Sequence, residues 1–130
     1  SQDYDPAAEA SKTFFATVQN KMHWAVHGQT AAEVIAARAD ATQPRMGLMS
    51  WTGSRPQQAD VEIAKNYLGQ DELEALNRIV TAYLEFAELL ALNKTPMTMS
   101  DWIAKLDAFL QLSGRKVLQH AGRITMAYCY

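Results

Sequence analysis

The sequence predicts an all-α protein, a compact bundle of about six helices with one irregular loop region around residues 41–56. Apolar residues recur every three or four positions along most of the chain, which is the period of an amphipathic helix. Capping residues and glycines interrupt this pattern where helices should begin and end. Hydrophobic residues make up 48% and charged residues 20%, which is typical of a folded globular protein.

The first helix is expected at residues 6–27. Asp5 can accept hydrogen bonds from the free amides, Pro6 has no amide to leave unbonded, and Gly28 ends the helix. Thr30 and Glu33 form a capping-box pattern for a shorter second helix that ends near Asp40. Residues 41–56 are too interrupted for a helix because they contain Pro44, Gly47, Gly53 and Pro56.

Helical periodicity then returns and predicts a helix at residues 57–68, which Gly69 would cap. The longest helix should start at Gln70 or Asp71 and continue to about residue 93, with the clearest amphipathic pattern in the chain. Ser100 and Asp101 would cap another helix, broken at Ser113-Gly114. A last helix is expected to contain Val117, Leu118, Ala121 and Ile124.

The length of 130 residues fits one domain, which we expect to span residues 1–130. Because the sequence begins with Ser1, we expect a fragment of a longer protein. Cys129 is the single cysteine and cannot form an internal disulfide, which favours a reducing compartment. Neither a signal peptide nor a membrane span is visible, so we expect a cytoplasmic protein that does not enter membranes.

Charge is distributed unevenly along the chain. Residues 57–92 have a balance of −5, whereas residues 12–55 have a balance of +3. After Asp107 only basic residues follow, and these are the candidates for nucleic-acid contact: Arg115, Lys116 and Arg123. We favour two solvated faces over an interaction surface, since a duplex-binding domain is normally strongly basic. A helix-turn-helix formed by residues 57–68 and 70–92 is rejected, because its second helix would bring acidic side chains against phosphates.

A candidate polar cluster surrounds the irregular region. Its members are Arg38, Asp40, Ser50, Trp51, Lys65, Asn66 and Tyr67. The loop around Trp51 resembles neither a phosphate-binding loop nor a nucleophile elbow. We therefore interpret the cluster as a satisfied structural network rather than a ligand site.

His23 and His27 are four residues apart on one helical face, a spacing at which two imidazoles can share a metal. No third ligand is identifiable, and we interpret both histidines as polar residues beside the core. No serine, cysteine or paired-carboxylate pattern predicts a catalytic site. We therefore expect no metal and no cofactor, and we lean against an enzyme.

Several short blocks in the order of the chain resemble the carboxy-terminal part of the RhuM family of bacterial virulence-associated proteins. They are Asp3-Tyr-Asp-Pro6, Phe14-Phe-Ala-Thr-Val-Gln-Asn-Lys21, Thr30-Ala-Ala-Glu-Val-Ile35 with Arg38-Ala-Asp40, Met46-Gly-Leu48, Ser50-Trp51 with Gly53, Ala64-Lys-Asn-Tyr-Leu68, Leu76-Asn-Arg-Ile-Val80, and Asp101-Trp102 with Leu106-Asp107.

The resemblance implies that this part of the protein accompanies a DNA-binding part and does not itself contact DNA. Members of that family are commonly described as candidate DNA-binding proteins, with a helix-turn-helix-like segment in an amino-terminal part that this sequence does not contain. Some relatives are joined to a Fic-type domain, which transfers nucleotide moieties. Its His-Pro-Phe signature is absent, since the three histidines are followed by Trp, Gly and Ala.

We therefore predict a non-catalytic helical module that serves oligomerisation or partner binding beside a DNA-binding amino-terminal part. Two alternatives stay open. One is a small-ligand or nucleotide-binding enzyme domain that uses the loop around Trp51. The other is direct nucleic-acid binding by residues 12–55 and the basic residues near the C-terminus.

Overall fold

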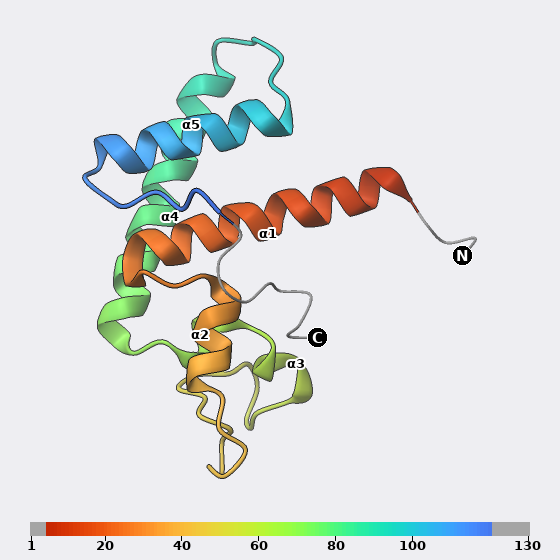
Figure 1. Ribbon diagram of the computed structural model, residues 1–130, viewed down its shortest axis with the longest axis vertical. Helices are drawn as coiled ribbons and strands as arrows, with labels where there is room; N and C mark the ends of the chain where they lie inside the picture. Colours follow the sequence, from red (N-terminus) through yellow and green to blue (C-terminus); the bar gives the residue numbers. More distant parts are fainter. Residues whose placement is uncertain (1–4, 121–130) are drawn as a thin grey trace.

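All regular structure in the computed structural model, which describes residues 5–120, is helical, and this confirms the all-α prediction (Figure 1). Within that range the elements are α1 (Pro6–His27), α2 (Ala31–Arg38), α3 (Gln58–Val61), a 3₁₀ turn η1 (Ala64–Tyr67), α4 (Gln70–Ala91) and α5 (Met99–Leu112). None of these helices is long and apolar enough to cross a bilayer.

Helix α1 begins and ends at the residues that the sequence predicts. The Asp5 carboxylate accepts a 3.0 Å hydrogen bond from the Ala7 amide, and Gly28 adopts the left-handed conformation that ends the helix. In Figure 1, α1 crosses the middle of the molecule, with α5 on one side and α2 on the other, while its first half extends past the other helices. Contacts to α2, α4 and α5 make α1 the central element of the fold.

Helix α2 is capped by the predicted box, since Thr30 accepts from the Glu33 amide and Glu33 accepts from the Thr30 amide. Residues 41–56 that follow are turns and bends, as predicted. Gly47 has a φ of +86°, and its backbone lies so close to the Arg38 carbonyl that a Cβ atom would overlap with it. The loop therefore folds back onto the end of α2.

The single helix predicted at residues 57–68 is wrong. Helix α3 ends at Val61, and η1 begins at Ala64. A continuous helix would bond the Asp60 and Val61 carbonyls to the amides four residues later. Instead the Asn66 side chain donates to the Asp60 carbonyl at 3.1 Å, and the Tyr67 hydroxyl donates to the Val61 carbonyl at 2.6 Å. Gly69, predicted as a C-terminal cap, is the N-cap of α4.

Helix α4 begins at Gln70, one of the two predicted positions, and ends two residues before the predicted end. Helix α5 begins earlier than predicted, because Thr98 and Asp101 form its capping box. It ends before Ser113-Gly114, as predicted.

The last predicted helix is wrong as far as the structure describes it. Residues 115–120 are not helical, and Ala121 and Ile124 lie outside the described residues. The Arg115 amide donates back to the Leu110 carbonyl, which ends α5. The Leu118 carbonyl accepts a 2.6 Å hydrogen bond from the Lys21 ammonium group instead of a helical amide. This segment therefore lies against α1 without regular secondary structure.

The hydrophobic core lies where α1, α2, α4, α5 and η1 meet. Its most deeply buried large side chains are those of Tyr67, Leu106, Leu110 and Val34. Lys21 is only 8% exposed, and its ammonium group lies 2.8 Å from the Asp107 carboxylate on α5. A buried ammonium group is costly unless it is paired, so this contact helps to set the position of α5 on α1.

Candidate functional site

Arg38 of the candidate polar cluster connects α2 to α4. Its two terminal nitrogens each lie 2.7 Å from an oxygen of Glu72, and one also donates to the Tyr67 carbonyl at 3.0 Å. Hydrogen bonds from Arg38 and from the Gly69 amide lower the pKa of Glu72 to about 2. The fork geometry uses both carboxylate oxygens, so Arg38 has a structural partner that sequence reasoning did not identify.

Ser50 and Asn66 of the cluster do come together. The Asn66 carbonyl accepts from the Met49 and Ser50 amides at 2.7 and 3.1 Å, and the Ser50 hydroxyl lies 3.4 Å from the Asn66 side-chain oxygen. Beside them, Asp60 is buried and accepts from the Gln57 amide and from Thr52. These backbone hydrogen bonds lower its pKa. Ser50, Asp60 and Asn66 therefore join the loop to η1, and each of them has hydrogen-bond partners there.

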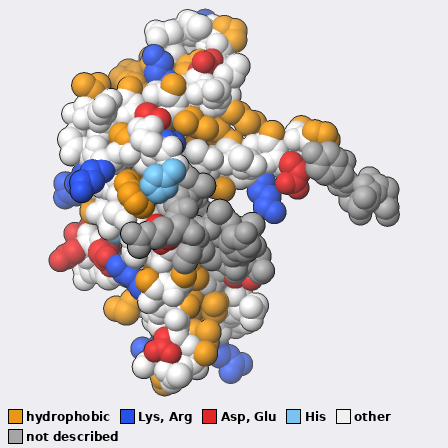
Figure 2. All heavy atoms as spheres, in the orientation of Figure 1, with side chains coloured by type: hydrophobic (Ala, Val, Ile, Leu, Met, Phe, Trp, Pro, Cys, Tyr) orange, Lys and Arg blue, Asp and Glu red, His pale blue; other side chains and the backbone are white. Residues whose placement is uncertain are grey.

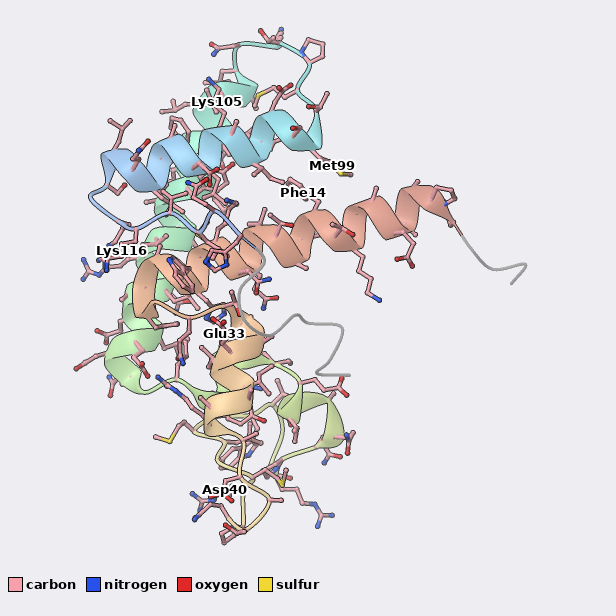
Figure 3. All side chains as sticks on the ribbon, in the orientation of Figure 1. Phe14, Glu33, Asp40, Met99, Lys105 and Lys116 are labelled. Carbon is pink, nitrogen blue, oxygen red and sulfur yellow. The ribbon has the colours of Figure 1, made fainter. Side chains whose placement is uncertain are left out.

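Other members of the cluster point elsewhere. Asp40 accepts from the amide and hydroxyl of Thr42 at the far end of the molecule from α5 (Figure 3). Trp51 packs under the guanidinium of Arg45, 5.4 Å from the ring centre, and Lys65 is exposed at a groove beside α1. A hollow of about 340 Å³ at the tip of the loop is lined by residues between Gln43 and Met49, and by none of the seven cluster members. The cluster does not converge on a cavity.

His23 and His27 contact each other, with Nδ1 of the first 3.0 Å from Nε2 of the second. One nitrogen must donate and the other accept, so the pair is stable only while at least one imidazole is neutral. Burial, followed by the charge of His27, lowers the pKa of His23 to about 4. Among residues 5–120, no three histidine, cysteine, aspartate or glutamate side chains are grouped to hold a metal.

Two of the three candidate nucleic-acid contacts lie in the described structure. Arg115 and Lys116 are both exposed in the turn after α5, and Arg123 lies outside the described residues.

Sequence reasoning missed an apolar groove between α1 and α4, closed at one end by Trp102 of α5. Its volume is about 630 Å³, within the range of ligand and peptide sites. Ten of its fourteen lining residues are apolar, and Gln19, His23, Lys65 and Asn77 supply the polar ones. Phe15 is 67% exposed and Leu84 56% exposed beside it.

Hydrophobic side chains gather along the extended part of α1 on the side that faces α5 (Figure 2). Phe14 lies on this side of α1, toward Met99 at the start of α5 (Figure 3). A sequence signal for the groove existed. Phe15, Val18 and Met22 are spaced three and four residues apart, so they share one face of α1.

The comparisons with known proteins identify the family of this chain but no specific activity. No curated protein matches this chain. No solved structure matches it either. Residues 1–129 match the Virulence protein RhuM family, which confirms the family that the sequence resembles. With a match over nearly its whole length, the chain belongs to the Virulence protein RhuM family.

Proposed function

We propose that this domain is a non-catalytic association module, through which a RhuM-family protein binds other copies of itself. The observation that carries the proposal is the groove between α1 and α4, with Phe15 and Leu84 exposed at its edges. Exposed apolar surface of this kind, rimmed by polar side chains, is typical of protein contact sites.

The polar residues support the same proposal. Arg38, Asp60 and Asn66 use their hydrogen bonds to hold loops and helices together. An interaction module needs a stable framework and an apolar surface, and these residues supply the framework.

The strength of the contact follows from the exposed area. A fully buried phenylalanine contributes about 1.5 to 3 kcal/mol, so covering the exposed two thirds of Phe15 would contribute about 1 to 2 kcal/mol. In a symmetric dimer this counts twice, for about 2 to 4 kcal/mol. Replacing Phe15 by glutamate should therefore weaken the dimer by about 30- to 700-fold.

Light scattering over a range of protein concentrations tests the proposal. We expect a dimer that Phe15→Glu and Leu84→Glu each convert to a monomer. The matched control is Leu89→Glu, because Leu89 is 64% exposed on the same helix but does not line the groove. A parent chain that stays monomeric at all concentrations, or a dimer lost equally in the control, would contradict the proposal.

Duplex DNA added to the same samples separates this proposal from direct nucleic-acid binding. We expect the mass of the dimer to be unchanged by DNA. A shift that weakens with salt and with Lys116→Glu would instead assign the function to the basic residues.

A further inference from the structure

We propose that the groove between α1 and α4 binds a small amphipathic ligand, a carboxylate with an unbranched alkyl chain. The carboxylate lies at the end of the groove that carries Lys65, and the alkyl chain lies toward the end closed by Trp102. This inference goes beyond self-association and does not depend on it, although a ligand and a second copy would cover the same surface.

The four polar lining residues share one end of the groove. They are Gln19 and His23 on α1, Lys65 on η1 and Asn77 on α4. The stretch of α1 that contains His23 lies beside the start of α4, since His27 and Glu72 are close enough for the charge of Glu72 to act on the pKa of His27. Because η1 directly precedes α4, Lys65 belongs to the same end.

The other end of the groove is apolar. It is lined by Phe14 and Phe15 of α1, Leu84 and Ala87 of α4, and Trp102 of α5. The Tyr83 hydroxyl donates to the Trp102 carbonyl at 3.0 Å, which holds α5 against this part of α4. Phe14 lies on the side of α1 toward Met99, one turn before Trp102 (Figure 3). The lining therefore changes from polar to apolar along the groove, as the two ends of an amphiphile do.

Charge at the polar end favours an anionic head group. Among the residues that the structure describes, Lys65 is the one lysine, arginine or carboxylate side chain that lines the groove, and neither ion pair found there includes it. Glu72, the acid that lies near His27, has both carboxylate oxygens bonded to Arg38. A ligand carboxylate would give Lys65 a partner of opposite charge that this end of the groove does not supply.

His23 offers a second contact for the carboxylate. The side chain is 2% exposed, and its Nδ1 lies 3.0 Å from Nε2 of His27. No hydrogen bond within residues 5–120 reaches its other nitrogen, Nε2. Burial lowers the pKa of His23 to about 4, so the ring is neutral at neutral pH. When Nδ1 accepts from His27, Nε2 carries the proton and can donate it to a carboxylate oxygen.

The alkyl chain should supply most of the affinity. The volume of about 630 Å³ is within the range of small-molecule sites, and Phe15 and Leu84 leave apolar surface for the chain to cover. Each methylene group that is fully buried should tighten binding about fourfold. The groove is open to solvent, so we expect about two- to fourfold for each methylene group, or about 4- to 15-fold between octanoate and decanoate.

Calorimetric titration with octanoate and decanoate, both below their micelle concentrations, tests the position of the alkyl chain. Ala87→Trp places a large ring in the apolar end and should abolish binding. The matched control is Ala82→Trp, because Ala82 is exposed on the same helix and does not line the groove. Binding that survives in Ala87→Trp, or that both variants lose equally, would overturn the site. Circular dichroism of each variant verifies that it is folded.

The head group is tested at an exposed position that folding does not depend on. Lys65→Met should weaken decanoate about two- to fivefold, as expected for an exposed ion pair, and should leave 1-octanol unaffected. Lys105→Met, at an exposed lysine of α5 outside the groove, should change neither ligand. Decanoate should also shift the NMR signal of His23 Nε2. A carboxylate that binds equally to the parent and to Lys65→Met would refute the predicted orientation.

Light scattering during the titration separates this inference from the proposed function. Decanoate in the groove should lower the mass of the dimer, because it covers the surface around Phe15. A dimer whose mass stays constant while decanoate binds would place the second copy elsewhere and contradict the proposed function alone. No saturable binding of decanoate in dilute solution, where dissociation frees the groove, would overturn the ligand site alone.

Discussion

Acidification should destabilise this domain through His23. Its imidazole is 2% exposed and contacts His27, and its pKa is lowered from 6.5 to about 4 by burial and by that neighbour. Because the folded pKa is the lower one, the unfolded chain takes up the proton first. The stabilisation is complete above pH 6.5 and is lost as the pH falls towards 4.

The size of the effect follows from the two pKa values. Between about pH 7 and about pH 5, His23 alone should lower the free energy of unfolding by about 2 kcal/mol. His27 adds a loss in the same direction, since burial lowers its pKa more than Glu72 raises it. The stabilisation that Glu72 provides is present above pH 4.5 and is lost only as the pH falls below that value, because its folded pKa is the lower one, so it changes little in this interval.

Urea unfolding followed by far-UV circular dichroism at the two pH values measures this loss. His23→Gln keeps a polar side chain but cannot titrate. It should be less stable than the parent at about pH 7, yet its stability should change by about 2 kcal/mol less on acidification. An unchanged pH dependence in this variant, or an NMR titration that puts the pKa of His23 above about 6, would refute the reasoning.

Three further changes test the framework by urea unfolding. Gly47→Ala should cost more than about 2 kcal/mol, because its Cβ would overlap with the Arg38 carbonyl, whereas Gly53→Ala, with open space around it, should cost only about 1 kcal/mol. Equal costs would show that the loop adapts. Arg38→Met should lower the free energy of unfolding by about 1 kcal/mol above pH 4.5. The loss is small because both partners are about a third exposed, so that water screens the ion pair. It should also reduce the loss of stability that Glu72 causes between pH 4.5 and 2 in the parent, without abolishing it, because the Gly69 amide still donates to Glu72. An undiminished loss would assign it to another group. Lys21→Ala should cost about 3 kcal/mol and Lys21→Met less, since methionine retains the packed stem without a charge. Both variants remove the ion pair with Asp107, so the reverse order would mean that packing of the stem contributes little.

Local signals predicted the helices whose ends depend on nearby residues. Asp5 and Pro6 start α1, the Thr30 and Glu33 box starts α2, and Ser113-Gly114 follows α5. Each of these devices acts within four residues, so it is legible in a single sequence. The same locality made the apolar face of α1 visible, although only the structure shows that Phe15 on this face is 67% exposed.

Two errors came from hydrogen bonds that the periodicity does not reveal. Residues 57–68 have helical spacing, but the side chains of Asn66 and Tyr67 take the carbonyls that a helix would use. Residues 115–120 have apolar residues suited to a helix, but Lys21, 97 positions away from Leu118, takes a backbone carbonyl there. In both places an alternative hydrogen-bond partner outcompeted the helical one.

The sequence by itself determined the fold class, the family and the position of most helix ends, because hydrophobic period and capping are properties of neighbouring residues. Only the tertiary structure decided what the polar residues do. It paired Arg38 with Glu72, joined Asn66 to Asp60 and left Lys65 at a groove that no segment forms alone. That groove lies between α1 and α4, which pack together although their residues are about 60 positions apart along the chain, and no local pattern reveals such packing.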